Sequence, residues 1–227
     1  MMEFFRYPHT PHLACLGAYV PRDDKVLSPA EVRDLLSQDV VVEEKLDGAN
    51  LGISVDPDGN IQVQNRGQYL VPPFSGQFSR LQVWVSQHGE ALVPALGDAL
   101  ILFGEWCAAR HSIYYNHLPD WFIAFDIYDR HAGQFWSTVR RDTFVEGLGF
   151  TVVPPLTRRR VTLPELMDIT KTSTSRFGEA PLEGVIVRHE NTKFLEQRAK
   201  LVRADFAQTI TEHWRSRPIE WNRLATA

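Results

Sequence analysis

Cysteine is scarce in this chain of 227 residues, which contains only Cys15 and Cys107. Two cysteines are too few for a disulfide framework or for a cysteine-based zinc site, so we expect two reduced thiols. Long apolar runs are also missing, because none approaches the roughly 20 residues that a membrane-spanning helix needs. The first residues lack the basic and then apolar order of a signal peptide. We therefore expect a soluble, cytoplasmic protein with no membrane partner.

An excess of positive charge is absent as well. The formal net charge is −4, and 23% of the residues are charged. A mildly acidic chain has no general affinity for polyanions, so a nucleic-acid site would have to be a local basic patch. The most compact basic run is Arg158-Arg159-Arg160. A solvated loop or strand edge is the simpler interpretation of this run, and a contact with nucleic acid is the alternative.

Apolar residues make up 44% of the chain, which is enough for one substantial core. Alternating and apolar patterns predict strands at 40–45, 50–55, 61–67, 99–106, 121–129, 184–190 and 198–203. Helical spacing and capping signals predict helices at 28–38, 78–92, 137–150 and 162–171. The fold class is therefore α+β, with mixed, mainly antiparallel β-sheets flanked by helices.

No change in composition marks a linker, so we interpret residues 1–227 as a single domain. Residues 204–227 are expected to close it as a terminal helix packed on the domain, with a helix end before Pro218. Three tryptophans, Trp84, Trp106 and Trp214, are expected to serve core or sheet-edge packing rather than to stack on bases.

The stretch VVEEKLDGAN, residues 41–50, places Lys45 between a β-branched run and a glycine turn. Most lysines are solvated, so an ion pair with Glu43, Glu44 or Asp47 is the simplest interpretation. A P-loop lysine is excluded, because the chain contains no G-x-x-x-x-G-K-[ST] pattern. A nucleophilic lysine is the third possibility. It needs an uncharged amine, which burial and nearby cations favour and carboxylates oppose.

Further motifs favour the nucleophile. EKLDGAN resembles the K-x-D-G-x-N element of the covalent nucleotidyltransferases, specifically of their RNA ligase branch. Five later stretches resemble further elements of that family in the same order: QNRG (64–67), LFGEW (102–106), FIAFDIYD (122–129), EGVIVR (183–188) and RAKLVR (198–203). The chain thus resembles the compact ATP-dependent RNA ligases. The resemblance implies a nucleotidyltransferase, ATP-grasp-like adenylation domain without an OB-fold.

The resemblance also implies a three-step reaction with ATP and a divalent cation, Mg²⁺ or Mn²⁺. Lys45 would attack the α-phosphorus of ATP and keep the AMP as a lysyl-AMP intermediate. The AMP would then pass to the 5′-phosphate of an RNA, and a 3′-hydroxyl would displace it to join the two ends. RNA with these ends is the implied partner, together with an end-healing kinase or phosphatase.

Binding roles follow from the same resemblance, residue by residue. Glu44 would meet adenine through its backbone, and Asn50 would orient a phosphate or the hydrated metal. Arg66 would hold ribose or phosphate, and Glu105 would accept a ribose hydroxyl. Phe125 would stack on adenine. The intervening Asp47 and Gly48 would shape the turn after the lysine.

The last two elements supply the remaining implied roles. Glu183 would position the metal ion through water. Lys200, together with Arg198, would contact the α-phosphate and lower the pKa of the nucleophile by like-charge repulsion. Arg110 and His111 are candidates for gripping a 5′-phosphate, and a structural role for both is equally open.

Two features bear on the substrate. Asn50 stands where DNA ligases and capping enzymes usually carry arginine, which favours RNA ligase, and Arg198 stands where many relatives carry lysine. Two other functions stay open: a ligase that seals nicks in DNA or RNA/DNA hybrids, and a non-catalytic RNA-end-binding module.

Overall fold

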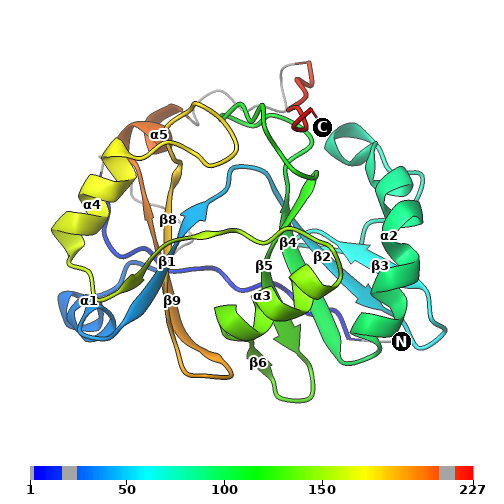
Figure 1. Ribbon diagram of the computed structural model, residues 1–227, viewed down its shortest axis with the longest axis horizontal. Helices are drawn as coiled ribbons and strands as arrows, with labels where there is room; N and C mark the ends of the chain where they lie inside the picture. The colour runs from blue at the N-terminus through cyan, green and yellow to red at the C-terminus, as the bar shows by residue number, and fades with distance from the viewer. Residues whose placement is uncertain (1–2, 17–24, 210–217, 227) are drawn as a thin grey trace.

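The structure is a computed structural model that describes residues 3–16, 25–209 and 218–226. Within these ranges the chain forms two β-sheets that stand side by side, with helices on their outer sides (Figure 1). The first sheet has the strand order β7-β1-β8-β9, and the second has the order β3-β2-β4-β5-β6. Neighbouring strands in both sheets run antiparallel. The predicted α+β class with mainly antiparallel sheets is confirmed.

The first sheet is built from β1 (Val40–Lys45), β7 (Pro155–Arg159), β8 (Gly184–Glu190) and β9 (Leu195–Val202). Helices α1 (Pro29–Leu36) and α4 (Leu163–Thr172) lie at its outer side, and α5 (Ala204–Thr209) follows β9 (Figure 1). Both α1 and α4 begin with the capping boxes that the sequence predicts. Buried Leu35, Leu166 and the apolar side chains of β1, β8 and β9 form one core cluster between helices and sheet.

The second sheet is built from β2 (Ala49–Val55), β3 (Ile61–Gln64), β4 (Leu100–Trp106), β5 (Phe122–Asp129) and β6 (Gln134–Phe135). Helix α2 (Leu81–Leu96) packs on it, a short 3₁₀ turn η1 (Gly76–Phe78) precedes α2, and α3 (Thr138–Gly147) contacts β5. Trp84 and Trp106 lie in the core cluster of this half, as predicted.

Several element bounds differ from the sequence prediction. Helix α2 continues through Pro94 to Leu96, and β9 begins at Leu195, earlier than the motif suggests. The two-residue strand β6 is too short to produce a periodic signal.

Arg158 and Arg159 of the basic run lie on β7, an edge strand of the first sheet, and Arg160 follows it, as the simpler interpretation predicts. Arg158 pairs with Asp142, and Arg159 pairs with Glu165. Arg160 lies 3.8 Å from Asp39. Because each guanidinium has a carboxylate partner, this run carries less uncompensated charge than the sequence suggests.

The expected terminal helix begins at Ala204, as α5 does, and its predicted end before Pro218 agrees with residues 218–226, but a helix through residue 227 is wrong. Trp214 lies outside the described residues. Residues 218–226 are not helical; they form isolated β-bridges between Trp221 and Ala109 and between Leu224 and Leu118. Backbone amides of this segment donate to carbonyls of distant loops rather than to residues four positions earlier, as in a helix; the Asn222 N–H, for example, donates to the Ala108 carbonyl at 3.0 Å.

Candidate active site

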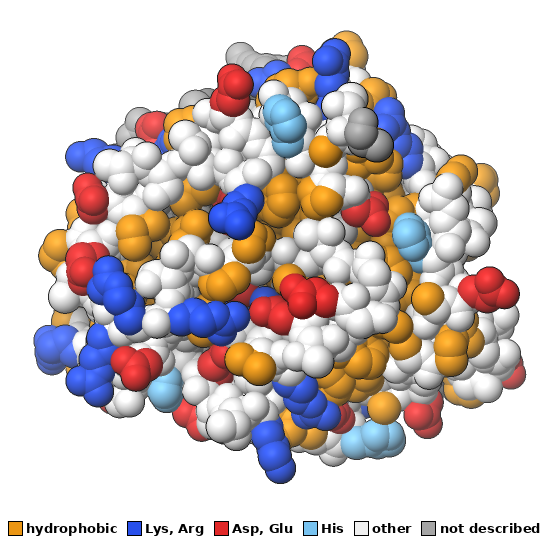
Figure 2. Space-filling model, in the orientation of Figure 1, with side chains coloured by type: hydrophobic (Ala, Val, Ile, Leu, Met, Phe, Trp, Pro, Cys, Tyr) orange, Lys and Arg blue, Asp and Glu red, His pale blue; other side chains and the backbone are white. Residues whose placement is uncertain are grey.

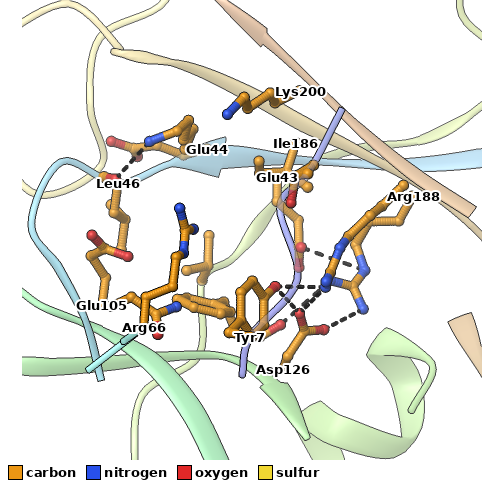
Figure 3. Close-up of a pocket in the computed structure, with 16 residues that line it drawn as sticks. Tyr7, Glu43, Glu44, Leu46, Arg66, Glu105, Asp126, Ile186, Arg188 and Lys200 are labelled. Carbon is orange, nitrogen blue, oxygen red and sulfur yellow. Dashed lines mark hydrogen bonds and ion pairs between the residues drawn. The ribbon is translucent and has the colours of Figure 1, made fainter. Parts of the chain in front are cut away.

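A pocket opens between the two sheets, and its lining comes from both of them. Figure 3 shows Glu44 and Glu105 on one side, Tyr7 and Asp126 on the other, and Arg66 reaching in between them. The full lining is Tyr7, Thr10, Glu43, Glu44, Lys45, Leu46, Asn50, Arg66, Glu105, Phe125, Asp126, Val153, Ile186, Arg188, Arg198 and Lys200. The structure thus brings together in one cavity eight of the residues predicted from the motifs.

Strand register in the first sheet aims the basic residues at this pocket. Glu43 pairs with Ile186, and Ile186 pairs with Lys200, so these three residues share one face of the sheet. Lys45, two residues after Glu43, lies on that same face and pairs with Gly184. The alternation of strand residues therefore explains why two lysines from distant motifs converge.

The amine of Lys45 forms an ion pair in this structure. Its Nζ donates to a carboxylate oxygen of Glu183 at 2.7 Å, and the lysine side chain is 26% exposed. Burial lowers the pKa of Lys45, but the nearby carboxylates of Glu183, Glu105 and Asp47 raise it by more. The net direction is upward. In the protein without nucleotide, the carboxylates therefore outweigh burial, and the lowering of this pKa by Lys200 and Arg198 stays a prediction.

The two glutamates around the lysine have unusual protonation behaviour. Burial raises the pKa of Glu105 to about 8 and that of Glu183 to about 7, and their mutual repulsion adds to the shift at Glu105. Glu105 also accepts a hydrogen bond from the Gly48 N–H at 3.0 Å. Three carboxyl groups, of Glu105, Glu183 and Asp47, thus surround the single amine of Lys45. A cation bound in this part of the pocket would reduce their mutual repulsion.

The loop after Lys45 is fixed by the segment that follows β4. Asp47 accepts hydrogen bonds from the Ser112 and Ile113 amides, both at 2.7 Å, and its own N–H donates to the Tyr115 hydroxyl at 2.8 Å. A Cβ at Gly48 would lie 2.7 Å from the Trp106 carbonyl oxygen. Only glycine fits this close approach, so backbone contacts set the position of the loop that follows Lys45.

Four buried polar atoms of pocket-lining residues have no hydrogen-bond partner among the described residues: Oε1 of Glu44, Nε of Arg188, Oδ1 of Asn50 and Nε of Arg66. The two that bear on the predicted phosphate contacts are those of Asn50 and Arg66. Buried polar atoms are almost always paired, so unpaired ones in a cavity indicate that a polar ligand completes them. The Asn50 oxygen can accept from a hydroxyl or a metal-bound water, and the Arg66 donor suits a ribose or phosphate oxygen. The predicted roles of these two residues are compatible with that chemistry and stay predictions.

A β-bulge places two consecutive residues in the pocket. Gly104 pairs with Ala124 and Phe103 pairs with Asp126, which leaves Phe125 without a partner on β4. In a regular strand Phe125 and Asp126 would point to opposite faces, but the bulge lets both line the cavity. The Phe125 carbonyl is held by the Arg141 guanidinium at 2.6 Å.

Beside Phe125 lies a buried network of charges that sequence reasoning did not find. Asp126 accepts from Arg188 at 2.8 Å and from Arg198 at 2.5 Å. Arg141, from α3, donates to Glu43 at 2.7 Å and is fully buried. The only sequence signal for this network was Asp126 inside the apolar run FIAFDIYD. A buried carboxylate needs a charged or hydrogen-bonding partner, so its presence in a buried strand indicates that such partners lie nearby.

Other residues lie where the motifs gave no indication, or outside the pocket. Tyr7 and Thr10 come from the irregular N-terminal segment and line the cavity. Arg110 pairs with Glu220 at 2.8 Å, and His111 bonds to Gln77 at 2.7 Å. Neither lines the pocket, so their proposed contact with a phosphate has no support from this geometry.

The oxygen ligands for a metal ion are few. Among the described residues, no group of three His, Cys, Asp or Glu side chains is arranged to hold a metal ion alone. Magnesium commonly binds through one or two carboxylates together with substrate phosphates. The Glu183 carboxylate, which pairs with Lys45, is compatible with magnesium binding through one carboxylate and substrate phosphates.

Outside the pocket, charge is mixed. On the face shown in Figure 2, basic side chains lie interspersed with acidic ones rather than in one basic area. No described helix is long and apolar enough to span a membrane. Cys15 is exposed and Cys107 is buried, and neither is in a disulfide.

Comparison with known proteins adds a family and a fold. A family model described as RNA ligase matches residues 38–202. No curated protein matches the chain in sequence. Among solved structures, a mutant of the RNA ligase of Naegleria gruberi with ATP and Mn superposes with a TM-score of 0.65 at 17% identity, covering 92% of this chain and 59% of that one.

The same Naegleria gruberi ligase with pyrophosphate superposes with a TM-score of 0.61 at 20% identity, covering 94% of this chain and 65% of that one. A further mutant, with AMP and Mn, gives a TM-score of 0.60 at 17% identity and covers 90% and 64%. The chain therefore spans less than two thirds of the length of these ligases. At such identities the likeness supports the fold.

Proposed function

Because the chain belongs to the RNA ligase family, we propose that it is an ATP-dependent RNA ligase acting through a lysyl-AMP intermediate. The substrates are RNA ends that carry a 3′-hydroxyl and a 5′-phosphate. The observation that carries the proposal is the convergence of Lys45 with Glu44, Asn50, Arg66, Glu105 and Lys200 in one pocket between the two sheets.

The first step forms a bond between Nζ of Lys45 and the α-phosphorus of ATP. The bond from that phosphorus to the bridging oxygen of the β-phosphate breaks, pyrophosphate leaves, and the amine loses its protons to give a phosphoramidate. The amine must be uncharged to attack, so its ion pair with Glu183 must open or pass a proton to Glu183 first. The pKa of about 7 at Glu183 suits a group that exchanges a proton near neutrality.

The pocket residues bind and orient the nucleotide in this proposal. Phe125 stacks on adenine, a contact worth about 1–3 kcal/mol in base recognition generally. The unpaired Nε of Arg66 donates to ribose or phosphate, the unpaired Oδ1 of Asn50 accepts from a metal-bound water or a hydroxyl, and Lys200 lies toward the α-phosphate. A divalent cation, Mg²⁺ or Mn²⁺, would be held by Glu183 through water and would supply positive charge against the phosphates.

The later steps transfer the AMP and join the strands. An oxygen of the RNA 5′-phosphate attacks the phosphorus of lysyl-AMP, and the nitrogen–phosphorus bond breaks to free Lys45. The 3′-hydroxyl of the second end then attacks the 5′-phosphate and AMP leaves. A kinase or phosphatase that prepares 5′-phosphate and 3′-hydroxyl ends is the class of enzyme that would supply this substrate.

The proposal is tested by incubating the protein with α-labelled ATP and Mg²⁺. The wild type is expected to retain the label covalently, and Lys45→Ala is expected to retain none. Lys171→Ala, which removes an exposed lysine from α4, serves as the matched control and should label normally. Equal labelling of Lys45→Ala and wild type would contradict the proposal.

A second assay separates RNA ligation from the alternatives. The labelled protein is offered nicked duplexes whose 3′-hydroxyl and 5′-phosphate strands are RNA, DNA or one of each. We expect AMP transfer and sealing to be fastest with RNA ends. Preferential sealing of DNA ends would favour a nick-sealing DNA ligase, and RNA binding without any AMP transfer would favour a binding module.

A further inference from the structure

The N-terminal segment, described over residues 3–16, adds to the outer edge of β9 beside the pocket. The Lys200 N–H donates to the Pro11 carbonyl, and the Leu13 N–H donates to the Lys200 carbonyl, both at 2.8 Å. The backbone of Lys200 is thus held on one side by Ile186 of β8 and on the other by this segment. The position of Lys200 depends on how the segment is seated.

The same segment also packs on the second sheet. Phe5 stacks on Tyr128 of β5 with ring centroids 3.7 Å apart. Between this contact and the β9 edge lies Tyr7, which is 6% exposed and lines the pocket. Tyr7 therefore occupies the place where the segment crosses from one sheet to the other.

The ring of Tyr7 contacts the residue that we assign to adenine. Its centroid lies 5.4 Å from that of Phe125, with the rings at 69° in an edge-to-face arrangement. The guanidinium of Arg66 lies 6.0 Å from the centroid of the Tyr7 ring. The ring thus supports two side chains that line the pocket.

The hydroxyl of Tyr7 is tied to two charged groups. It donates to Asp126 at 2.5 Å and accepts from Nη1 of Arg198 at 2.5 Å (Figure 3 shows Tyr7 and Asp126). Burial raises the pKa of Tyr7 well above its ordinary value, so the hydroxyl keeps its proton and remains a donor. These contacts fix the ring in one orientation.

The guanidinium of Arg198 is bound by neighbouring protein side chains rather than left available for a ligand. Its Nη1 also lies 2.5 Å from Asp126, and its guanidinium stacks 4.5 Å from the Tyr7 ring and 4.6 Å from the Phe135 ring. The side chain is 8% exposed. The planar guanidinium of Arg198 hydrogen-bonds to two groups and stacks on two aromatic rings at once. A lysine ammonium group cannot make this combination of contacts.

We propose that Tyr7, Asp126 and Arg198 form a clamp that seats the N-terminal segment and thereby positions Phe125 and Lys200 for the nucleotide. This inference rests on the proposed function, because it assigns Tyr7 and Arg198 as positioning residues of that same site. It differs from the expectation that Arg198 contacts the α-phosphate.

Direct binding of ATP tests the clamp without the reaction. In full-length Lys45→Ala protein, the dissociation constant for ATP is measured by calorimetry, alone and after adding Tyr7→Phe or Tyr7→Leu. Tyr7→Phe removes the hydroxyl and leaves a buried charged partner less satisfied, so we expect about tenfold weaker binding. Tyr7→Leu also removes the ring contacts, and we expect a further loss of about tenfold.

The matched control is Tyr69→Phe. Tyr69 packs edge-on against Phe4 of the same segment, with centroids 5.1 Å apart, but it does not line the pocket. This change should leave ATP binding within about twofold. Melting temperatures of all variants are recorded, and binding is measured well below them. A merely structural role would lower the melting temperature without weakening binding at that temperature.

Arg198→Lys distinguishes the clamp from a phosphate contact. A lysine would keep the charge for a phosphate and match the residue common in relatives, so unchanged or tighter ATP binding would overturn the clamp. We expect instead about tenfold weaker binding, because the fork and the stacking are lost.

The two proposals fail separately. If wild-type protein forms the AMP adduct but Tyr7→Phe and Tyr7→Leu bind ATP like their parent, the clamp is wrong and the ligase proposal stands. If no adduct forms but the Tyr7 variants still weaken ATP binding, the clamp stands for a nucleotide site and the ligase proposal fails. If the Lys45→Ala protein binds no ATP and wild type forms no adduct, both are overturned.

Discussion

Gly184, the first residue of β8 and the neighbour of Glu183, controls the distance between β8 and β9, the strand that carries Lys200. A Cβ at this position would lie 2.2 Å from the Leu201 carbonyl oxygen and 2.9 Å from the Val202 Cα. Backbone atoms of a paired strand cannot move aside like a flexible side chain. Glycine at this position therefore lets β8 and β9 approach closely enough to share one pocket face.

We predict that Gly184→Ala destabilises the protein by about 2–3 kcal/mol, because the added methyl group forces β9 away from β8. Gly147→Ala is the matched control, since a Cβ at the end of α3 meets nothing within 4 Å. Alanine should stabilise that helix by up to about 1 kcal/mol. Urea unfolding of both variants measures the difference. Equal stabilities would show that the strand pair tolerates the methyl group.

The ion pair between Lys45 and Glu183 leads to a second residue-level prediction, about pH dependence. Glu183 is one of the carboxylates that raise the pKa of Lys45, so Glu183→Gln should lower that pKa. The pH dependence of Lys45 acetylation without nucleotide, followed by mass spectrometry, should shift to lower pH in the variant. Glu196→Gln, an exposed change on β9, should leave the profile in place. A shift to higher pH in Glu183→Gln would contradict the assigned ion pair.

At the scale of elements, the C-terminal segment 218–226 supports the loop after Lys45 indirectly. Asn222 is 2% exposed, donates to the Cys107 carbonyl and accepts from the Tyr115 N–H. The Tyr115 hydroxyl in turn accepts from the Asp47 N–H. One amide side chain at the end of the chain is thus two contacts away from the turn that follows Lys45.

We predict that Asn222→Ala lowers the free energy of unfolding by about 1–3 kcal/mol, because buried backbone groups lose their partner. Arg223→Ala, at the adjacent exposed position, should change it by no more than about 0.5 kcal/mol. Thermal or urea unfolding is the measurement. If the two variants behaved alike, the segment would not hold the loop.

Elements and motifs were predictable where the signal is local. The capping boxes of α1 and α4 and the strands around Lys45 follow from patterns within a few residues. Phe125 and Asp126 facing the same pocket did not follow, because strand alternation separates neighbours and only the bulge reunites them. Tyr7 was missed because its place depends on contacts with residues more than a hundred positions away.

Across the whole molecule, buried charges join the two sheets. Asp126 belongs to β5 of the second sheet, whereas Arg188 and Arg198 belong to β8 and β9 of the first. Burial raises the pKa of Asp126, but the two guanidinium groups lower it by more, so the carboxyl is held ionised. These buried ion pairs therefore connect the two sheets at residues that line the pocket.

We predict that Asp126→Asn destabilises the protein by about 3–5 kcal/mol at pH 7, because two buried cations lose their countercharge. The native pKa of Asp126 lies below its unfolded value of about 3.9, so its stabilisation is present above that pH and is lost as the pH falls through the native value. The difference between wild type and variant, measured by urea unfolding, should therefore shrink below about pH 4. A difference that stays constant down to pH 2 would contradict this assignment.

The N-terminal segment is attached to both walls of the cavity, at Tyr128 on one sheet and at Lys200 on the other. Any motion that separates the two sheets must therefore break one of these contacts or move the N-terminal segment with a sheet. We expect the rates at which nucleotide binds and dissociates to depend on how fast residues 3–13 attach to and detach from the sheets.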